Sequence, residues 1–451
     1  MTVAPAEALE TLRDNPAYCR AYQAAMRSAA HFMHWRTPKV LADYSELRDE
    51  LRAHNITSVL VVSDPGLVKA GLVDTLENSL RDAGFKIARY ADTAPGPTTD
   101  DVARGLEQYY SLQNDGSVAN NSTGIVALGG GSAMDCAKGI AARVAKPNKS
   151  IAQLRGQLKV RSGMPYLAAI PTTAGTGSET TVAAVITDPE THEKGAINDP
   201  ALIPQSAVLD PRLTEGVPPK VTAATGIDAL SHAVEAYIGQ SNTYETKRDA
   251  LIATRLIFRW LPEAVRNGHN LEARAAMQRA AFLAGTAFTR AYVGYVHAAS
   301  HQLSALYGTV HGVGNGALMP HVLEMYGHSC DKQLADLGRA AEIPGWDQGT
   351  DSEKAQRFIA AVRDLTSDIG LPLTLPEIKP EDIPQLAEKA AKEGNPLYPV
   401  PKIFSVGDFE KLYESVSEPP ADESRGFETA PDGASSTDGT MLPSTGSASV
   451  G

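Results

Sequence analysis

Hydrophobic residues recur with two different spacings along the chain. Between about residues 38 and 210, short apolar and β-branched runs alternate with longer stretches of helical periodicity. The short runs predict buried strands, and the longer stretches predict helices. Strands and helices in alternation are typical of a parallel sheet that is covered on both faces. The expected strands are 58–63, 85–90, 124–128 and 166–170, and the expected helices are 65–83, 100–113 and 132–144.

After residue 220 the pattern is helical almost throughout, with helices expected over 244–260, 272–287, 352–369 and 382–393. We therefore expect an α/β dinucleotide-binding domain over 37–220, followed by an all-helical metal-binding domain over 221–417. A helical extension is expected over 1–36. Residues 418–451 are rich in Ser, Gly, Pro and acidic residues. This composition predicts a disordered tail, because it cannot bury enough apolar surface to offset the entropy of ordering.

Composition narrows the function classes. The chain has 451 residues, 43% of them hydrophobic, and a net charge of -12. An acidic protein with no basic run is a poor candidate for nucleic-acid binding. We expect no membrane association, because no apolar run reaches the ~20 residues that a membrane span needs. The odd number and wide spacing of Cys19, Cys136 and Cys330 argue against a disulfide framework and favour a cytoplasmic location.

A glycine-rich turn joins the expected strand 124–128 to the expected helix 132–144. Gly129, Gly130 and Gly131 let backbone approach a phosphate closely, and helix N-terminal amides favour an anion. We expect Ser132 to cap the helix and to donate to the phosphate. Asp135 lies in the first helical turn, where the helix dipole favours a carboxylate. The turn predicts a pyrophosphate site, and the alternative is a tight connection without a ligand.

A second loop of small residues follows the strand 166–170. Thr172, Thr173 and Thr176 offer hydroxyl and backbone donors with little bulk, although an ordinary polar loop would look the same. Two such loops at the ends of parallel strands favour a dinucleotide. Asp64, at the end of the strand 58–63, is suited to accept from the adenosine ribose, which favours NAD over NADP. The alternative is that Asp64 caps the helix that starts at Pro65.

The strongest chemical signal is a group of histidines in the helical half. Asp228 and His232 are four residues apart, which places them one turn apart on one helical face. Further along are His297, His301 and His311. We expect Asp228, His232, His297 and His311 to converge on one divalent ion, and imidazole with carboxylate suits Fe²⁺ or Zn²⁺.

These segments resemble the iron-containing (group III) alcohol dehydrogenase family. The motifs are GGGSAMD at 129–135, PTTAGTGSE at 171–179, DALSH at 228–232, HAASH at 297–301 and HG at 311–312. The resemblance covers roughly residues 38–417. It implies a dehydroquinate synthase-like architecture, in which an NAD(P)-binding α/β domain precedes a helical metal-binding domain. It also implies a homodimer.

The resemblance assigns roles to individual residues. It gives the metal ligands as Asp228, His232, His297 and His311, and it places His301 beside the substrate without ligating. Lys194 matches a position that approaches the nicotinamide ribose, and Asp64 matches an acid associated with NAD preference. The cofactor contacts that it implies are Gly130, Gly131, Ser132, Thr172 and Thr173. The chain departs from the family pattern at Arg290 and Val310, where the family often has Asn and Pro.

The expected reaction is reversible hydride transfer between a primary alcohol or aldehyde and NAD. A Lewis-acid metal lowers the pKa of the alcohol, and His301 is the candidate proton relay. Two alternatives stay open. One is a related polyol or hydroxyacid dehydrogenase or a dehydroquinate synthase-like enzyme. The other is a non-catalytic binding or filament-forming protein on the same fold.

Overall fold

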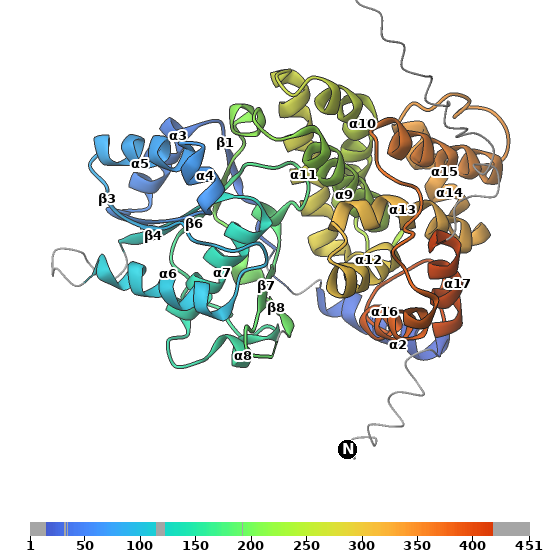
Figure 1. Ribbon diagram of the computed structural model, residues 1–451, viewed down its shortest axis with the longest axis horizontal. Coiled ribbons are helices and arrows are strands. Elements are labelled where there is room, and N and C mark those ends of the chain that lie inside the picture. The colour runs from blue at the N-terminus through green and yellow to red at the C-terminus, as the bar shows by residue number, and fades with distance from the viewer. Residues whose placement is uncertain (1–14, 31–32, 34, 114–121, 192, 418–451) are drawn as a thin grey trace, which may run out of the picture. The chain divides into compact units, whose positions relative to one another are not determined.

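The computed structural model describes residues 15–30, 33, 35–113, 122–191 and 193–417. The predicted tail lies outside the described residues, as do residues 1–14 of the predicted N-terminal extension. Strands occur in the part of the chain drawn from blue to green, and helices make up the part drawn from yellow to red (Figure 1). The predicted fold class, a parallel α/β sheet followed by an all-helical region, is confirmed. The domain boundary at residue 220 stays a prediction.

A six-stranded parallel sheet forms the α/β part, in the order β1-β9-β6-β4-β2-β3. In the register of β4 and β6, Gly129 lies opposite Pro171. The two loops that follow these strands therefore start side by side at the carboxyl edge of the sheet. The strands are β1 (Lys39–Leu41), β2 (Ser58–Val62), β3 (Lys86–Tyr90), β4 (Thr123–Gly129), β6 (Leu167–Pro171) and β9 (Ser206–Val208).

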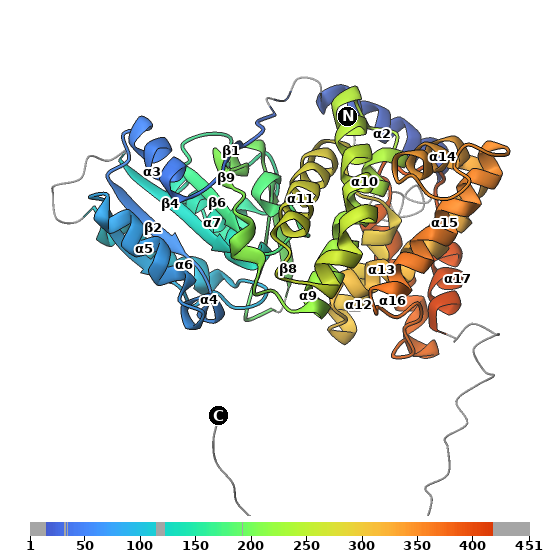
Figure 2. The ribbon, with the colours of Figure 1, turned by 90° about the horizontal axis from the view of Figure 1, so that it is seen from above.

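Both faces of this sheet are covered by helices. In β2, Val59 and Val61 join the core cluster under α3 (Tyr44–Ala53) and α5 (Leu72–Asp82). Leu60 and Val62 join the opposite cluster, under α6 (Thr99–Ser111) and α7 (Gly131–Ala145). Successive side chains of a strand point to opposite faces, so an uninterrupted apolar run is what a strand buried on both faces requires. Figure 2 shows the helices on either side of the strands.

The α/β part differs from the prediction in several elements. α3, β1 and β9 were not among the expected helices and strands. The expected helix 65–83 is divided into α4 (Pro65–Lys69) and α5, because Gly71 adopts a φ of 75° that no helix accommodates. A separate three-stranded sheet follows a short helix, α8 (Ile151–Leu154). Its strands, in the order β5-β8-β7, are β5 (Gly156–Gln157), β8 (Lys194–Asn198) and β7 (Ala183–Thr187).

The helical part is built around α9 (Pro219–Ile238). Every residue of α9 from Gly226 to Ile238 is buried, and the helix packs against α10, α11 and α13. A helix that is buried on all sides belongs in the centre of a core, and the polar residues on it must find partners there. Of the helices in the described residues, none is long and apolar enough to cross a membrane.

The remaining elements complete the chain. The N-terminal helix α2 (Pro16–Ala30) precedes β1. Short 3₁₀ turns are Ser178–Thr180, Pro200–Leu202, Pro211–Thr214, Gly327–Cys330 and Pro380–Asp382. The other helices are α10 (Tyr244–Arg266), α11 (Leu271–Ala291), α12 (Tyr295–Tyr307), α13 (His311–Met325), α14 (Asp331–Ala340), α15 (Asp351–Asp368), α16 (Ile383–Gly394) and α17 (Val406–Ser417).

Candidate active site

Three helices bring one carboxylate and three imidazoles together. Asp228 and His232 lie on α9, His297 lies on α12, and His311 is the first residue of α13. Asp228 Oδ1 is 3.6 Å from Nε2 of His297, 3.4 Å from Nε2 of His311 and 3.8 Å from Nδ1 of His232. The ligand atoms of Asp228, His297 and His311 all lie within 4.8 Å of one another, which is a spacing that can hold a metal ion.

His232 joins this group from the side. Its ring is stacked between Phe288, at a centroid distance of 4.0 Å, and His297, at 4.4 Å. Its Nδ1 is buried, and no group in the described residues forms a hydrogen bond with it. A buried nitrogen without a partner is costly. A cation beside Asp228 would satisfy it, so the residues present fit a bound metal ion.

The protonation states of His232 and His311 also suit a metal. Burial lowers the pKa of both His232 and His311 to about 3, against the opposing effect of Asp228. Both rings are therefore neutral near pH 7 and can offer a lone pair. Burial alone would raise the pKa of Asp228, but the surrounding histidines lower it overall. Burial lowers the pKa of His297, yet Glu235 and Asp228 together raise it to about 9, so metal binding at His297 would release a proton.

His301 lies at the edge of the group. It follows His297 by one turn of α12, and its ring stacks on that of His311 at 5.1 Å. The side chain of His301 is 44% exposed, whereas those of Asp228, His232 and His297 are buried. Nδ1 of His301 is 2.6 Å from Oε1 of Glu393. His301 thus lies beside the group and in contact with solvent.

The two predicted loops meet at the carboxyl edge of the sheet. The backbone N–H of Thr172 donates to the carbonyl of Gly129, at 3.1 Å. Thr176 lies over Gly131, because a Cβ placed on that glycine would be 3.3 Å from Cγ2 of Thr176. Thr173 lies over Gly130 in the same way, at 3.5 Å from Oγ1. The two loops therefore form one surface of small residues. Such a surface allows a phosphate to approach the backbone closely.

The sequence predicted that Ser132 caps the helix, and this prediction is wrong. α7 begins at Gly131 with Gly130 in the cap position, and Ser132 lies inside the first turn. Its Oγ accepts a hydrogen bond from the N–H of Gly96, at 3.2 Å. The sequence misled because Ser is a favoured cap residue, whereas here the glycine turn itself supplies the extended cap conformation.

Asp135 lies where α7 meets the second loop. Its Oδ1 accepts from Oγ of Ser178, at 3.0 Å, and its Oδ2 accepts from the N–H of Val185, at 3.1 Å. Both carboxylate oxygens thus contact protein groups, and burial raises the pKa of Asp135. Asp135 thus joins α7 to the second loop and to β7.

The loops also connect to the helical part. Nε2 of Gln278, on α11, donates to the carbonyls of Pro171 and Asp210. A hydrogen bond to the backbone of Gly175, in the second loop, raises the pKa of His232 against the larger effect of burial. The second loop therefore reaches the Asp/His group, as a shared site for a cofactor and a metal requires.

Comparison with known proteins agrees with this geometry. A family model described as "Iron-containing alcohol dehydrogenase" matches residues 42–211, and one described as "Fe-containing alcohol dehydrogenase family, C-terminal" matches residues 222–417. The 1,3-propanediol dehydrogenase of Klebsiella pneumoniae is 40% identical over 342 residues, which is 74% of this chain and 85% of that protein. This chain belongs to the iron-containing alcohol dehydrogenase family. The predicted family and the predicted activity class are thereby confirmed.

Solved structures show the same fold. A 1,3-propanediol oxidoreductase matches with a TM-score of 0.79 and 35% identity, over 85% of this chain and 98% of that one. A sulfoacetaldehyde reductase from Bifidobacterium kashiwanohense in complex with NAD⁺ matches with a TM-score of 0.74 and 27% identity, over 85% and 99%. Both similarities extend across the α/β and helical parts together.

The remaining predicted residues occupy separate positions in this iron-containing alcohol dehydrogenase. Asp64 caps α4 by accepting from the N–H of Leu67, at 3.1 Å. Its Oδ2 also lies near Gly129, 3.5 Å from where a Cβ would be, so capping and a role near the glycine turn are compatible. Lys194 is exposed at the start of β8, opposite Thr187.

Sequence reasoning missed two residues that surround the group. Glu235, on α9, accepts from Nδ1 of His297 at 2.6 Å and from the N–H of Val296 at 2.7 Å. Nδ2 of Asn315, on α13, donates to Oδ1 of Asp228 at 2.9 Å. Spacing could have revealed both, since Glu235 follows His232 by three residues and Asn315 follows His311 by four.

A third missed residue, Lys138, lies between α7 and the end of the second loop. It is fully buried on α7, one turn after Asp135. Its Nζ lies within hydrogen-bonding distance of the Ser178 carbonyl, at 2.7 Å, and of Oγ1 of Thr181, at 2.7 Å. Lys138 thus holds the start of the small sheet against the helix that follows the glycine turn.

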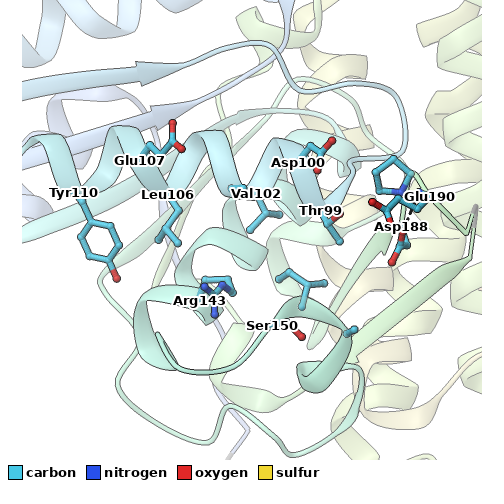
Figure 3. A pocket seen from close by; sticks show the side chains of 14 residues that line it. Thr99, Asp100, Val102, Leu106, Glu107, Tyr110, Arg143, Ser150, Asp188 and Glu190 are labelled. Carbon is cyan, nitrogen blue, oxygen red and sulfur yellow. Dashed lines mark hydrogen bonds between the residues drawn. The ribbon is translucent and has the colours of Figure 1, made fainter.

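A groove of about 590 Å³ lies elsewhere on the α/β part, between α6, α8 and the turn at 188–190 (Figure 3). Apolar side chains such as Val102 and Leu106 line it together with four carboxylates, Asp100, Glu107, Asp188 and Glu190. Its lining includes no histidine or cysteine and none of the predicted site residues. The groove is therefore separate from the Asp/His group.

Proposed function

We propose that this chain oxidises a small primary alcohol to the aldehyde, reversibly, with NAD⁺ as the hydride acceptor. The observation that carries the proposal is the convergence of Asp228, His297 and His311, with His232 next to Asp228. These four would hold Fe²⁺ or Zn²⁺. A bound metal ion supplies Lewis acidity, which lowers the pKa of the alcohol hydroxyl.

The cofactor is proposed to be NAD rather than NADP. Gly129, Gly130 and Gly131 with Ser132 would receive the pyrophosphate at the N-terminus of α7. The carboxylate of Asp64 would favour a ribose hydroxyl and repel a 2′-phosphate. Thr172, Thr173, Thr176 and Lys194 would line the rest of the cofactor site, and Asp135 would support it. The solved NAD⁺ complex of a relative supports this choice.

His301 is proposed to carry the proton. Its Nδ1 is held by Glu393, and because a carboxylate only accepts, the proton on that side belongs to the imidazole. Nε2 is then the nitrogen that can take the alcohol proton. The partial exposure of the ring gives that proton a route to solvent.

Two of the relatives support a proposal for the substrate class. Enzymes named 1,3-propanediol dehydrogenase and NAD-dependent methanol dehydrogenase are 40% and 35% identical to this chain. We therefore propose short, uncharged alcohols. A homodimer, a cytoplasmic location and the absence of nucleic-acid partners are proposed as well, from the family resemblance, the three scattered cysteines and the net charge of -12.

The test uses full-length protein that is dialysed and then reloaded with Fe²⁺ or Zn²⁺. NADH absorbance is followed with NAD⁺ and a panel from methanol to 1,3-propanediol. We expect turnover with at least one short alcohol, and loss of both metal and turnover in His311→Ala. Wild-type protein that binds metal but forms no NADH with any alcohol would refute the proposed reaction.

A further inference from the structure

The N-terminal helix α2 is attached to the segment that follows α16. Nε2 of Gln23 donates to the carbonyl of Tyr398 at 2.7 Å and to that of Pro396 at 3.2 Å. The guanidinium of Arg20 donates to the carbonyls of Val400 and Pro401, both at 2.7 Å. Four carbonyls of one short segment are thus held by two side chains of α2, which is drawn in blue in Figure 1.

The attachment is a buried one. Gln23 is only 4% exposed, and its Oε1 in turn accepts from Arg20 at 2.9 Å. A buried carbonyl that loses its donor is costly, so the position of 396–401 depends on α2. Residues 16–30 lie outside both segments that the family models match. This attachment is therefore a feature of this chain beyond the matched segments.

The held segment carries a side chain that reaches His301. The hydroxyl of Tyr398 donates to Oε1 of Glu393 at 3.0 Å. The same oxygen accepts from Nδ1 of His301 at 2.6 Å, while Oε2 accepts from Nε2 of Gln302 at 2.8 Å. A continuous series of contacts therefore runs from Gln23 through Tyr398 and Glu393 to His301.

We infer that α2 acts as a brace, which here means that it fixes the position of His301 through Tyr398 and Glu393. Glu393 and Tyr398 are then positioning residues for the reaction. The inference rests on the proposed role of His301 in moving the alcohol proton. Glu393 fixes the ring rotation and the tautomer, and Tyr398 fixes the Glu393 carboxylate. Gln23 and Arg20 act at a distance, because they determine where the backbone of Tyr398 lies. A misplaced proton carrier lowers the rate without changing how the cofactor binds.

A double-mutant cycle of Gln23→Ala and Tyr398→Phe in the full chain separates this role from general stabilisation. Each single variant is expected to lower kcat roughly 2- to 30-fold and to leave the KM for NAD⁺ and the metal content unchanged. Gln23→Ala should have little further effect once Tyr398→Phe has removed the hydroxyl. Ser28→Ala, on an exposed part of the same helix, is the matched control and should equal wild type.

A second readout needs no activity. Diethyl pyrocarbonate acylates accessible imidazoles, and mass spectrometry of the peptide containing His301 gives the rate of labelling. Release of His301 from Glu393 should raise that rate in both single variants and not in Ser28→Ala. This measurement applies even if the wild type forms no NADH. If Gln23→Ala does not fold, Tyr398→Phe still tests whether Tyr398 and Glu393 position His301.

The outcomes are distinct. Non-additive losses of kcat, with faster labelling of His301, support the brace. Additive losses of kcat, or labelling that neither variant changes, would overturn it while leaving the proposed dehydrogenase reaction intact. Absence of turnover in wild type, with faster labelling in the variants, would refute the reaction and retain the brace.

Discussion

Replacement of Glu235 by Gln tests how the protein holds the metal. Glu235 is 3% exposed on α9 and bridges to α12, where it contacts Nδ1 of His297 at 2.6 Å and the N–H of Val296 at 2.7 Å. The opposite nitrogen of His297 faces Asp228. Glu235 therefore selects the tautomer that leaves Nε2 for the metal, and its charge makes that nitrogen more basic.

The expected effect of Glu235→Gln is a 10- to 100-fold loss of metal affinity, the usual consequence of removing a partner behind a metal ligand. This corresponds to about 1.4 to 2.7 kcal/mol of binding free energy. Gln has nearly the volume of Glu, so the substitution leaves no cavity in the core. The charge behind His297 is lost, and the amide must accept from both donors through one oxygen.

The assay is competition for Fe²⁺ or Zn²⁺ between the protein and a chelator of known affinity. Glu77→Gln is a matched control, because Glu77 is another fully buried carboxylate, paired with Arg81 and Arg89 in the α/β part. We expect it to lower the thermal midpoint without changing metal affinity. Equal affinity in Glu235→Gln and wild type, or an equal loss in Glu77→Gln, would refute the reasoning.

Three further predictions concern His301, Asp64 and Glu179, the last of which is a buried carboxylate at the end of the second loop. His301→Ala should keep its metal and lose rate, as metal analysis and NADH formation would show; a metal-free variant would make His301 a ligand. Asp64→Asn, which keeps a capping side chain, should improve kcat/KM with NADP⁺ relative to NAD⁺, and an unchanged ratio would reduce Asp64 to a helix cap. Burial raises the pKa of Glu179 from 4.5 to about 7, so between these values the folded state holds a proton that the unfolded state has released. The unfolding free energy must therefore fall as pH rises through this window, by roughly 3 kcal/mol. Urea unfolding should show that Glu179→Gln lacks this fall, and an equal pH dependence in both proteins would contradict it.

The parts of the fold that the sequence predicts are those with a strong local pattern. The apolar run at 58–62 predicts a strand buried on both faces, and α9 reads as a helix from its apolar residues. Asp228 and His232 are found together because a helix places residues four apart on one face. The two glycine loops are recognised because each follows an apolar strand.

The parts that escape prediction depend on contacts between distant residues. Glu393 lies 92 residues from His301, and Gln23 lies 375 residues from Tyr398, so no local pattern links them. Glu235 has the right spacing to lie beside His232, but its partner His297 is 62 residues away, so the contact itself cannot be seen in the local pattern. The strands β5 and β8 escape because they are short and mostly exposed at their ends. Ser132 shows the opposite failure, in which a favoured cap residue lies two positions after the actual cap.

Metal stoichiometry is the most direct test of the account. Asp228 lies within 4 Å of all three histidines, and Asn has the same shape without the charge. After loading with Fe²⁺ or Zn²⁺ and dialysis, wild type should retain a single metal ion per chain, and Asp228→Asn should retain almost none. A variant that retains as much metal as wild type, or a wild type that retains none, would contradict the assignment of these four residues as the metal centre.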